Sequence, residues 1–164
     1  MMPEPENDLR ERAGELFQRA YERQMHGELD EAAELYKQSI GAFPTAEAYT
    51  FLGWTYSFMG RVDDAIAECH RAIEVDPTFG NPYNDIGAYL VEKNQLDEAI
   101  PWFERALQAP RYESYCFPHF NLGRVYERKR QFARALVEYK LALAENKLHT
   151  GAQRAVGRLR AMLN

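Results

Sequence analysis

The sequence has few cysteines and no long hydrophobic run, and each absence excludes a class of protein. None of its 164 residues belongs to an apolar run that approaches the roughly 18 residues of a transmembrane helix, so we expect no membrane span. Cys69 and Cys116 are the only cysteines. Two thiols do not make a disulfide framework, which predicts a reducing compartment and a cytoplasmic protein. The N-terminus is acidic and lacks the apolar core of a secretory signal, so we expect residues 1–10 to form a disordered lead.

The residue patterns of catalytic and metal sites are also missing. The four histidines, His26, His70, His119 and His149, are scattered, and none forms a cluster with acidic residues at metal-ligand spacing. Cys116 lies three residues before His119, but no second pair completes a zinc site. There is no phosphate-binding glycine loop and no glycine-flanked nucleophilic serine. We therefore predict a non-catalytic protein with no metal, no other cofactor and no small-molecule substrate.

Charge is distributed unevenly along the chain. Residues 1–118 carry 10 basic and 22 acidic side chains, whereas residues 119–164 carry 10 basic and 3 acidic ones, for a total of −5. A dipole of this kind can orient an approaching partner before contact. The acidic total argues against nucleic-acid binding, for which a basic surface is the usual requirement.

The strongest positive signal is an internal repeat. Three segments align, with glycines at positions 53, 87 and 123 that are 34 and 36 residues apart. Each copy has an apolar or aromatic residue four before the glycine, an aliphatic residue directly before it and an apolar residue three after it. The aligned residues are Tyr49, Leu52, Gly53, Tyr56, Ala65, Cys69 and Ala72; Tyr83, Ile86, Gly87, Leu90, Ala99, Phe103 and Ala106; and His119, Leu122, Gly123, Tyr126, Ala135, Tyr139 and Ala142. Their spacing predicts two helices per copy.

An earlier copy is degenerate. Ala32 and Tyr36 match its second half, whereas Arg19 and Arg23 occupy slots that are apolar in the other copies. Terminal repeats are often atypical in this way.

This pattern resembles the tetratricopeptide repeat family over roughly residues 13–149. The resemblance implies an all-α fold, a right-handed superhelical solenoid of antiparallel helix pairs. Its repeats would span residues 13–45 (the degenerate copy), 46–79, 80–113 and 116–149, within a domain over 11–149. Residues 150–164 would form a C-terminal capping helix, because Ala152, Ala155, Val156, Leu159, Met162 and Leu163 share one face.

Small residues predict where the helices of a pair cross. Glycine within a helix costs about 1 kcal/mol relative to alanine, so Gly53, Gly87 and Gly123 indicate crossings too close for a side chain. We expect the alanines at 65, 99 and 135 to lie opposite them.

The linking segment 109–118, here called the connector, is two residues longer than the equivalent link before it. Tyr112 and Tyr115 could form a contact loop, but we favour rings tucked onto the stack.

Stacked helix pairs leave a concave face lined by the first helix of each pair, and this face is the predicted binding groove for a peptide or protein partner. Its residues would be aromatic toward the N-terminus, polar and acidic in the middle and basic toward the C-terminus. They are Phe51, Trp54, Phe58, Asn81, Asn84, Asp85, Phe117, Phe120, Asn121, Arg124 and Arg128. The degenerate copy adds Phe17, Tyr21 and Met25 as weaker candidates.

An extended or helical peptide would place apolar side chains on Phe51, Trp54 and Phe58 and an acidic group on Arg124 and Arg128. The structural alternative is that Phe51 and Trp54 pack between repeats. Some grooves of this family capture the C-terminal carboxylate of heat-shock chaperones, but the basic pair is missing here and Asp85 would repel a carboxylate.

Three other functions remain open at this point. One is a secretion-type chaperone that holds an export client. Another is an assembly scaffold in which the acidic front docks on the basic rear of a second copy, giving a homo-oligomer. The last is nucleic-acid binding through the basic residues between positions 124 and 134, although a charged helix face is usually only solvated.

Overall fold

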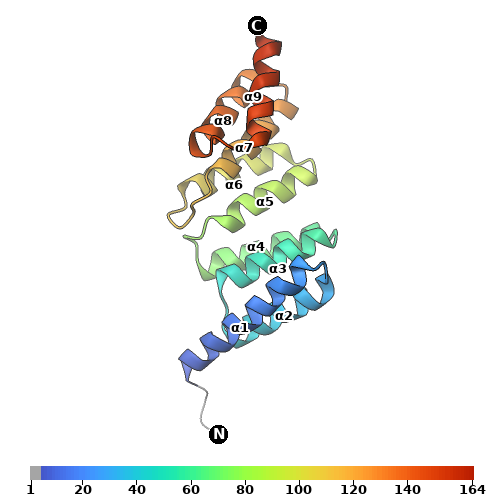
Figure 1. The fold of residues 1–164 in the computed structure, drawn as a ribbon, viewed down its shortest axis with the longest axis vertical. Helices are drawn as coiled ribbons and strands as arrows, with labels where there is room; N and C mark the ends of the chain where they lie inside the picture. The colour runs from blue at the N-terminus through green and yellow to red at the C-terminus, as the bar shows by residue number, and fades with distance from the viewer. Residues whose placement is uncertain (1–4) are drawn as a thin grey trace.

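The computed structural model describes residues 5–164, and the regular secondary structure of this part of the chain consists of helices (Figure 1). The only extended pairing within it is an isolated bridge between Phe79 and Arg111. No helix of residues 5–164 has the length and apolar character needed to cross a membrane. The described residues form nine helices, which are α1 (Glu6–Met25), α2 (Leu29–Ala42), α3 (Ala46–Phe58), α4 (Val62–Val75), α5 (Asn81–Glu92), α6 (Leu96–Gln108), α7 (Cys116–Arg128), α8 (Phe132–Glu145) and α9 (Thr150–Leu163).

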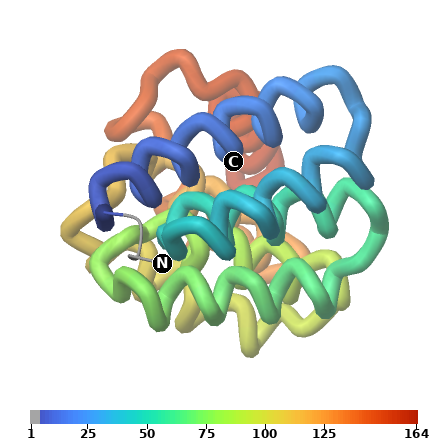
Figure 2. The backbone as a smooth tube through the Cα atoms, turned by 90° about the horizontal axis from the view of Figure 1, so that it is seen from below, coloured from blue at the N-terminus to red at the C-terminus, as the bar shows by residue number. Residues whose placement is uncertain are grey.

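Consecutive helices form hairpin pairs, and the pairs stack into an elongated solenoid with its ends far apart (Figure 1). Viewed along the stack, successive pairs are displaced around its axis rather than superposed (Figure 2). The first helices also contact one another across repeats, α1 with α3, α3 with α5 and α5 with α7. These four helices form what is called here the inner face.

The expected disordered lead is wrong for residues 6–10, because α1 begins at Glu6. Glu6 and Asp8 lie in its first turn, where acidic side chains interact favourably with the helix dipole. Arg10 adds an ion pair with Glu6, with 2.6 Å between Nη2 and Oε1. Acidic composition therefore marks a helix start here. Residues 1–4 lie outside the described part of the chain.

In the pairs α3/α4, α5/α6 and α7/α8 the helices cross at the predicted glycines, but the groups that fill two of these crossings differ from the prediction. A Cβ on Gly87 would lie 2.5 Å from Cε1 of Phe103, and one on Gly123 would lie 2.6 Å from Cδ1 of Tyr139. Only Gly53 faces the expected alanine, with its Cβ position 2.9 Å from the Ala65 carbonyl oxygen. The aromatic ring of the second helix thus occupies the space that glycine leaves.

The turns between the two helices of a pair share one backbone conformation. Gly27 and Gly60 adopt φ of 78° and 75°, and Asn94 and Arg130 adopt 58° and 61° at the equivalent places. A residue in this left-handed conformation ends a helix and lets the following amide bond back to it. In the first two turns this residue is a glycine, which the sequence shows, whereas the other two turns have no glycine at this place.

α9 packs on α8 and closes the C-terminal end of the stack. Ala152, Ala155, Val156 and Leu159 are buried as the pattern predicts. Met162 and Leu163, which the pattern placed on the same face, are exposed.

Substitution of Gly87 tests the crossing. Gly87→Ala should lower the free energy of unfolding by about 1–3 kcal/mol, because the added methyl group displaces the fully buried Phe103 ring. Gly14→Ala in α1 is the matched control, since no atom lies within 4 Å of its added Cβ. It should raise stability by up to about 1 kcal/mol through helix propensity. Equal effects of the two substitutions in urea denaturation would contradict the close crossing.

Candidate functional site

Six of the eleven predicted groove residues line one pocket on the inner face, between α3, α5 and the start of α7. The pocket has a volume of about 350 Å³. The connector contributes two further residues, so the site spans more than the first helices. The lining residues are Thr50, Phe51, Trp54, Asn81, Asn84, Asp85, Tyr112, Ser114 and Phe117. This cavity is called the central pocket below.

An aromatic run leads along the inner face to the central pocket. The ring centroids of Phe17 and Phe51 are 5.2 Å apart, those of Phe51 and Trp54 are 5.5 Å apart, and those of Trp54 and Phe58 are 5.4 Å apart. Tyr21 also packs edge-on against Phe51, at 5.9 Å. Of the weaker candidates in the degenerate copy, Phe17 and Tyr21 are therefore part of this cluster, whereas Met25 is exposed.

Phe51 and Trp54 differ in their surroundings. Phe51 is partly buried and packs between the first two repeats while one edge reaches the pocket. Trp54 is 40% exposed, Phe58 58% and Phe117 48%. Three large rings open to solvent on one face make an unusual surface, since aromatic side chains of this size are usually covered.

The connector forms one wall of the pocket, which sequence reasoning did not foresee. Tyr112 is buried against Gly80, where an added Cβ would lie 2.3 Å from that of Tyr112. Tyr115 packs edge-on against Tyr112 at 5.6 Å, and its hydroxyl donates to the Ala109 carbonyl. The rings are thus tucked onto the stack, as favoured from the sequence, and Tyr112 also lines the pocket.

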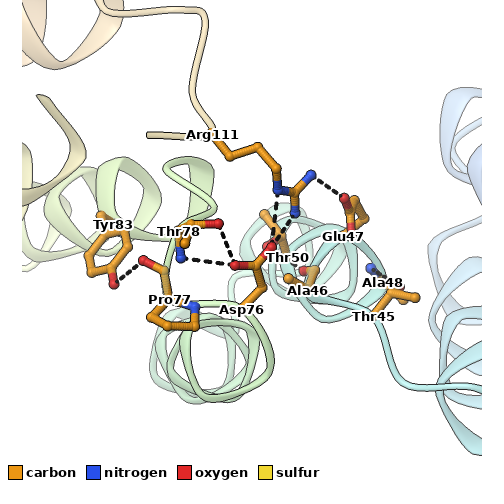
Figure 3. A network of polar contacts seen from close by, with 10 residues as sticks. All are labelled: Thr45, Ala46, Glu47, Ala48, Thr50, Asp76, Pro77, Thr78, Tyr83 and Arg111. Carbon is orange, nitrogen blue, oxygen red and sulfur yellow. Dashed lines mark hydrogen bonds and ion pairs between the residues drawn. The ribbon is translucent and has the colours of Figure 1, made fainter. Parts of the chain in front are cut away.

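Arg111 ties the connector to the preceding repeat (Figure 3). Its Nη1 lies 2.7 Å from Oε1 of Glu47 in α3, and its Nη2 lies 2.9 Å from Oδ2 of Asp76. Its backbone pairs with the segment before α5, donating to Thr78 and accepting from Gly80. The hydrogen bonds from Thr78, and then those from Arg111, lower the pKa of Asp76. Three separate segments therefore hold this wall in place.

Asp85 is the acidic group of the pocket. Burial raises its pKa to about 7, and a hydrogen bond with Asn84 opposes the shift. Asn84 in turn accepts from Asn121 of α7, with 3.1 Å between Oδ1 and Nδ2. No ion pair reaches Asp85 from any residue between 5 and 164.

The remaining predicted residues lie outside the central pocket. Phe58 lies at the end of the aromatic run, and Phe120 packs against Tyr139 and His149. Arg128 donates to the Val91 carbonyl and to Oδ1 of Asn94, so it is occupied by the neighbouring repeat. Arg124 is exposed, with its guanidinium 6.0 Å from the ring of Phe120. Of the two arginines predicted to meet an acidic group, Arg128 is thus engaged within the protein, and Arg124 is the one that stays a candidate.

The histidines and cysteines do not form a site in the described residues. His119 lies 2.8 Å from the Glu138 carboxylate, and both cysteines are buried, unpaired thiols. Burial raises the pKa of each thiol. Over residues 5–164, no three potential ligands come together to hold a metal ion.

Comparison with known families identifies the repeat. Residues 46–79 match one tetratricopeptide repeat model and residues 83–109 match another. The chain belongs to the tetratricopeptide repeat family. The matched segments coincide with α3/α4 and α5/α6, and the first helices of these two pairs, α3 and α5, contribute six residues to the lining of the central pocket. Tetratricopeptide repeats are protein-interaction modules, and neither model describes a catalytic domain.

Relatives and solved structures agree with this assignment. The chain is 32% identical over 88 residues to a probable UDP-N-acetylglucosamine–peptide N-acetylglucosaminyltransferase SPINDLY of Hordeum vulgare, covering 49% of this chain and 9% of that one. It is 26% identical over 107 residues to Hsp70-Hsp90 organizing protein 1 of Glycine max, covering 65% and 18%. The chain thus spans less than a fifth of these relatives. The structure of Pseudomonas aeruginosa PilF superposes with a TM-score of 0.84 at 19% identity, over 94% of this chain and 68% of that one. The predicted superhelical solenoid fold is confirmed.

Asp85 makes a specific prediction about stability and pH. Its pKa is higher in the folded chain than the ordinary 3.8, so the folded state binds the proton more tightly than the unfolded state. Stability from this group is therefore lost as pH rises between about 4 and about 7. Asp85→Asn should raise the free energy of unfolding by about 1–3 kcal/mol at pH 8 and by much less at pH 4.

Glu92→Gln is the matched control, because Glu92 is an exposed acid on the same helix. It should change stability by no more than about 0.5 kcal/mol at either pH. The measurement is urea denaturation followed by circular dichroism. A pH-independent gain for Asp85→Asn would show that the carboxylate is well solvated.

Proposed function

We propose that this chain is a non-catalytic adaptor that binds a peptide segment of another protein along its inner face. The observation that carries the proposal is the aromatic run of Phe17, Phe51, Trp54 and Phe58, whose two middle rings line the central pocket. Trp54, Phe58 and Phe117 are exposed to solvent, so a partner that covers their rings lowers the free energy of the complex. Aromatic residues are also common binding anchors.

The surrounding architecture supports this role. The pocket walls come from three repeats and the connector, and Arg111 and the Asn84–Asn121 bond hold them in place. A preformed site loses little entropy on binding. Of the relatives, the Glycine max protein is by name an organizer of two chaperones, which is an adaptor role.

One part of the earlier hypothesis enters this proposal in changed form. An acidic group of the peptide would be met by Arg124, since Arg128 is engaged with α5 and the turn that follows it. The cytoplasm is the compartment we propose, because the two thiols are buried and unpaired as in a reducing environment.

Replacement of Trp54 tests the proposal. When the chain is used to capture proteins from a lysate of the source cell, Trp54→Ala should no longer recover the partner. Its helicity and its unfolding midpoint should stay near those of wild type. Trp54 is 40% exposed, so truncation should cost less than the roughly 3–5 kcal/mol of a fully buried tryptophan.

Leu141→Ala is the matched control, because Leu141 is 41% exposed but lies on the second helix of the last pair. It should capture the same partner as wild type. If the Trp54 and Leu141 variants recover identical proteins, binding does not use the inner face. A cooperative loss of helicity in Trp54→Ala would instead make this residue part of the core.

A further inference from the structure

The central pocket combines aromatic rings with a carboxyl group and has no basic residue in its lining. Phe51, Trp54, Tyr112 and Phe117 supply the rings, and Asp85 supplies the acid. The other lining residues are neutral threonine, serine and asparagine side chains. Ring faces carry negative electrostatic potential, so they add to the attraction that a carboxylate exerts on a cation.

The protein does not neutralise Asp85 itself. The nearby connector guanidinium of Arg111 bonds to Glu47 and Asp76, in the adjoining network that Figure 3 shows. Within the described residues, Asp85 has a hydrogen bond with neutral Asn84 and no ion pair. A partly buried carboxylate without a counter-charge is costly, and a guest cation would remove that cost.

The pocket also has the size for one side chain and the backbone that carries it. Its volume of about 350 Å³ lies at the lower end of the range for small ligand sites. Ring faces suit the aliphatic stem and the charged head of a long basic side chain, and the amides of Asn81 and Asn84 can bond to the guest main chain.

We propose that the central pocket selects a basic side chain, lysine or arginine, of the bound peptide, held between the rings of Trp54 and Phe117 and paired with Asp85. This inference rests on the proposed function and adds the chemical class of the partner. It is compatible with an acidic group of the peptide opposite Arg124, because Arg124 lies outside the pocket.

Because Asp85 is proposed to pair with the basic side chain, the affinity for the peptide should depend on pH. The pKa of this group is about 7, so only part of the population is ionised near neutrality. The titratable groups that interact with it are Cys69 from α4, Tyr89 from its own helix and Tyr112 from the connector. Burial raises the pKa of all three, so they stay neutral in this range. Basic peptides should therefore bind more weakly as pH falls from about 8 to about 6, by up to about tenfold.

The test starts from a random dodecamer peptide library displayed on phage and selected on the full chain. Enriched peptides are synthesised, and each basic residue is replaced in turn by norleucine. Affinities are measured by fluorescence anisotropy for wild type, Trp54→Ala, Asp85→Asn and Glu92→Gln, with circular dichroism to verify folding. Wild-type affinity is also measured between pH 6 and pH 8, which requires no variant.

The proposal predicts one lysine or arginine at a fixed position in the enriched peptides. Its replacement by norleucine, or Asp85→Asn, should weaken binding by about tenfold or more, whereas Glu92→Gln should have little effect. The affinity of the norleucine peptide should also be the same at pH 6 and at pH 8.

Two other outcomes separate this inference from the proposed function. Peptides that need Trp54 but carry no basic residue, and bind Asp85→Asn as well as wild type, would overturn the basic-residue specificity and leave the adaptor function standing. A selection that yields no peptide dependent on Trp54 would overturn both.

Discussion

The close crossing of the two helices in each pair is the constraint on which the rest of the structure depends. Gly87 and Gly123 leave space that the rings of Phe103 and Tyr139 fill, and Gly53 approaches the backbone at Ala65. Each crossing sets how closely the two helices of one hairpin approach, and the stacking of such hairpins gives the array its curvature. The inner face is a consequence of this repetition, since every first helix is turned to the same side.

The connector changes this regular pattern at the central pocket. A uniform array would present similar first-helix surfaces in every repeat. Here the longer link lets Tyr112 pack on Gly80 and lets Arg111 reach Glu47 of the preceding repeat. The result is a walled pocket that spans three repeats and includes the connector.

The same region is where the chain departs from what stability alone would favour. Exposed rings at Trp54 and Phe117, and a carboxylate whose pKa is raised by burial, are each unfavourable in the free protein. A ligand that covers the rings and pairs with the acid would relieve both. Sites that oppose local stability in this way are the expected locations of binding.

The sequence by itself determined the repeat, because helix pairing depends on local period and on glycines that recur in phase. It also indicated that Phe51, Trp54, Asn81, Asn84, Asp85 and Phe117 share a face, since that follows from helical spacing. Only the tertiary structure decided which of these residues meet. Tyr112 entered the pocket and Arg128 was engaged elsewhere, because both depend on contacts between segments about 30 residues apart or more along the chain. Local periodicity carries no information about such contacts, and so the side-chain chemistry of the pocket required the fold.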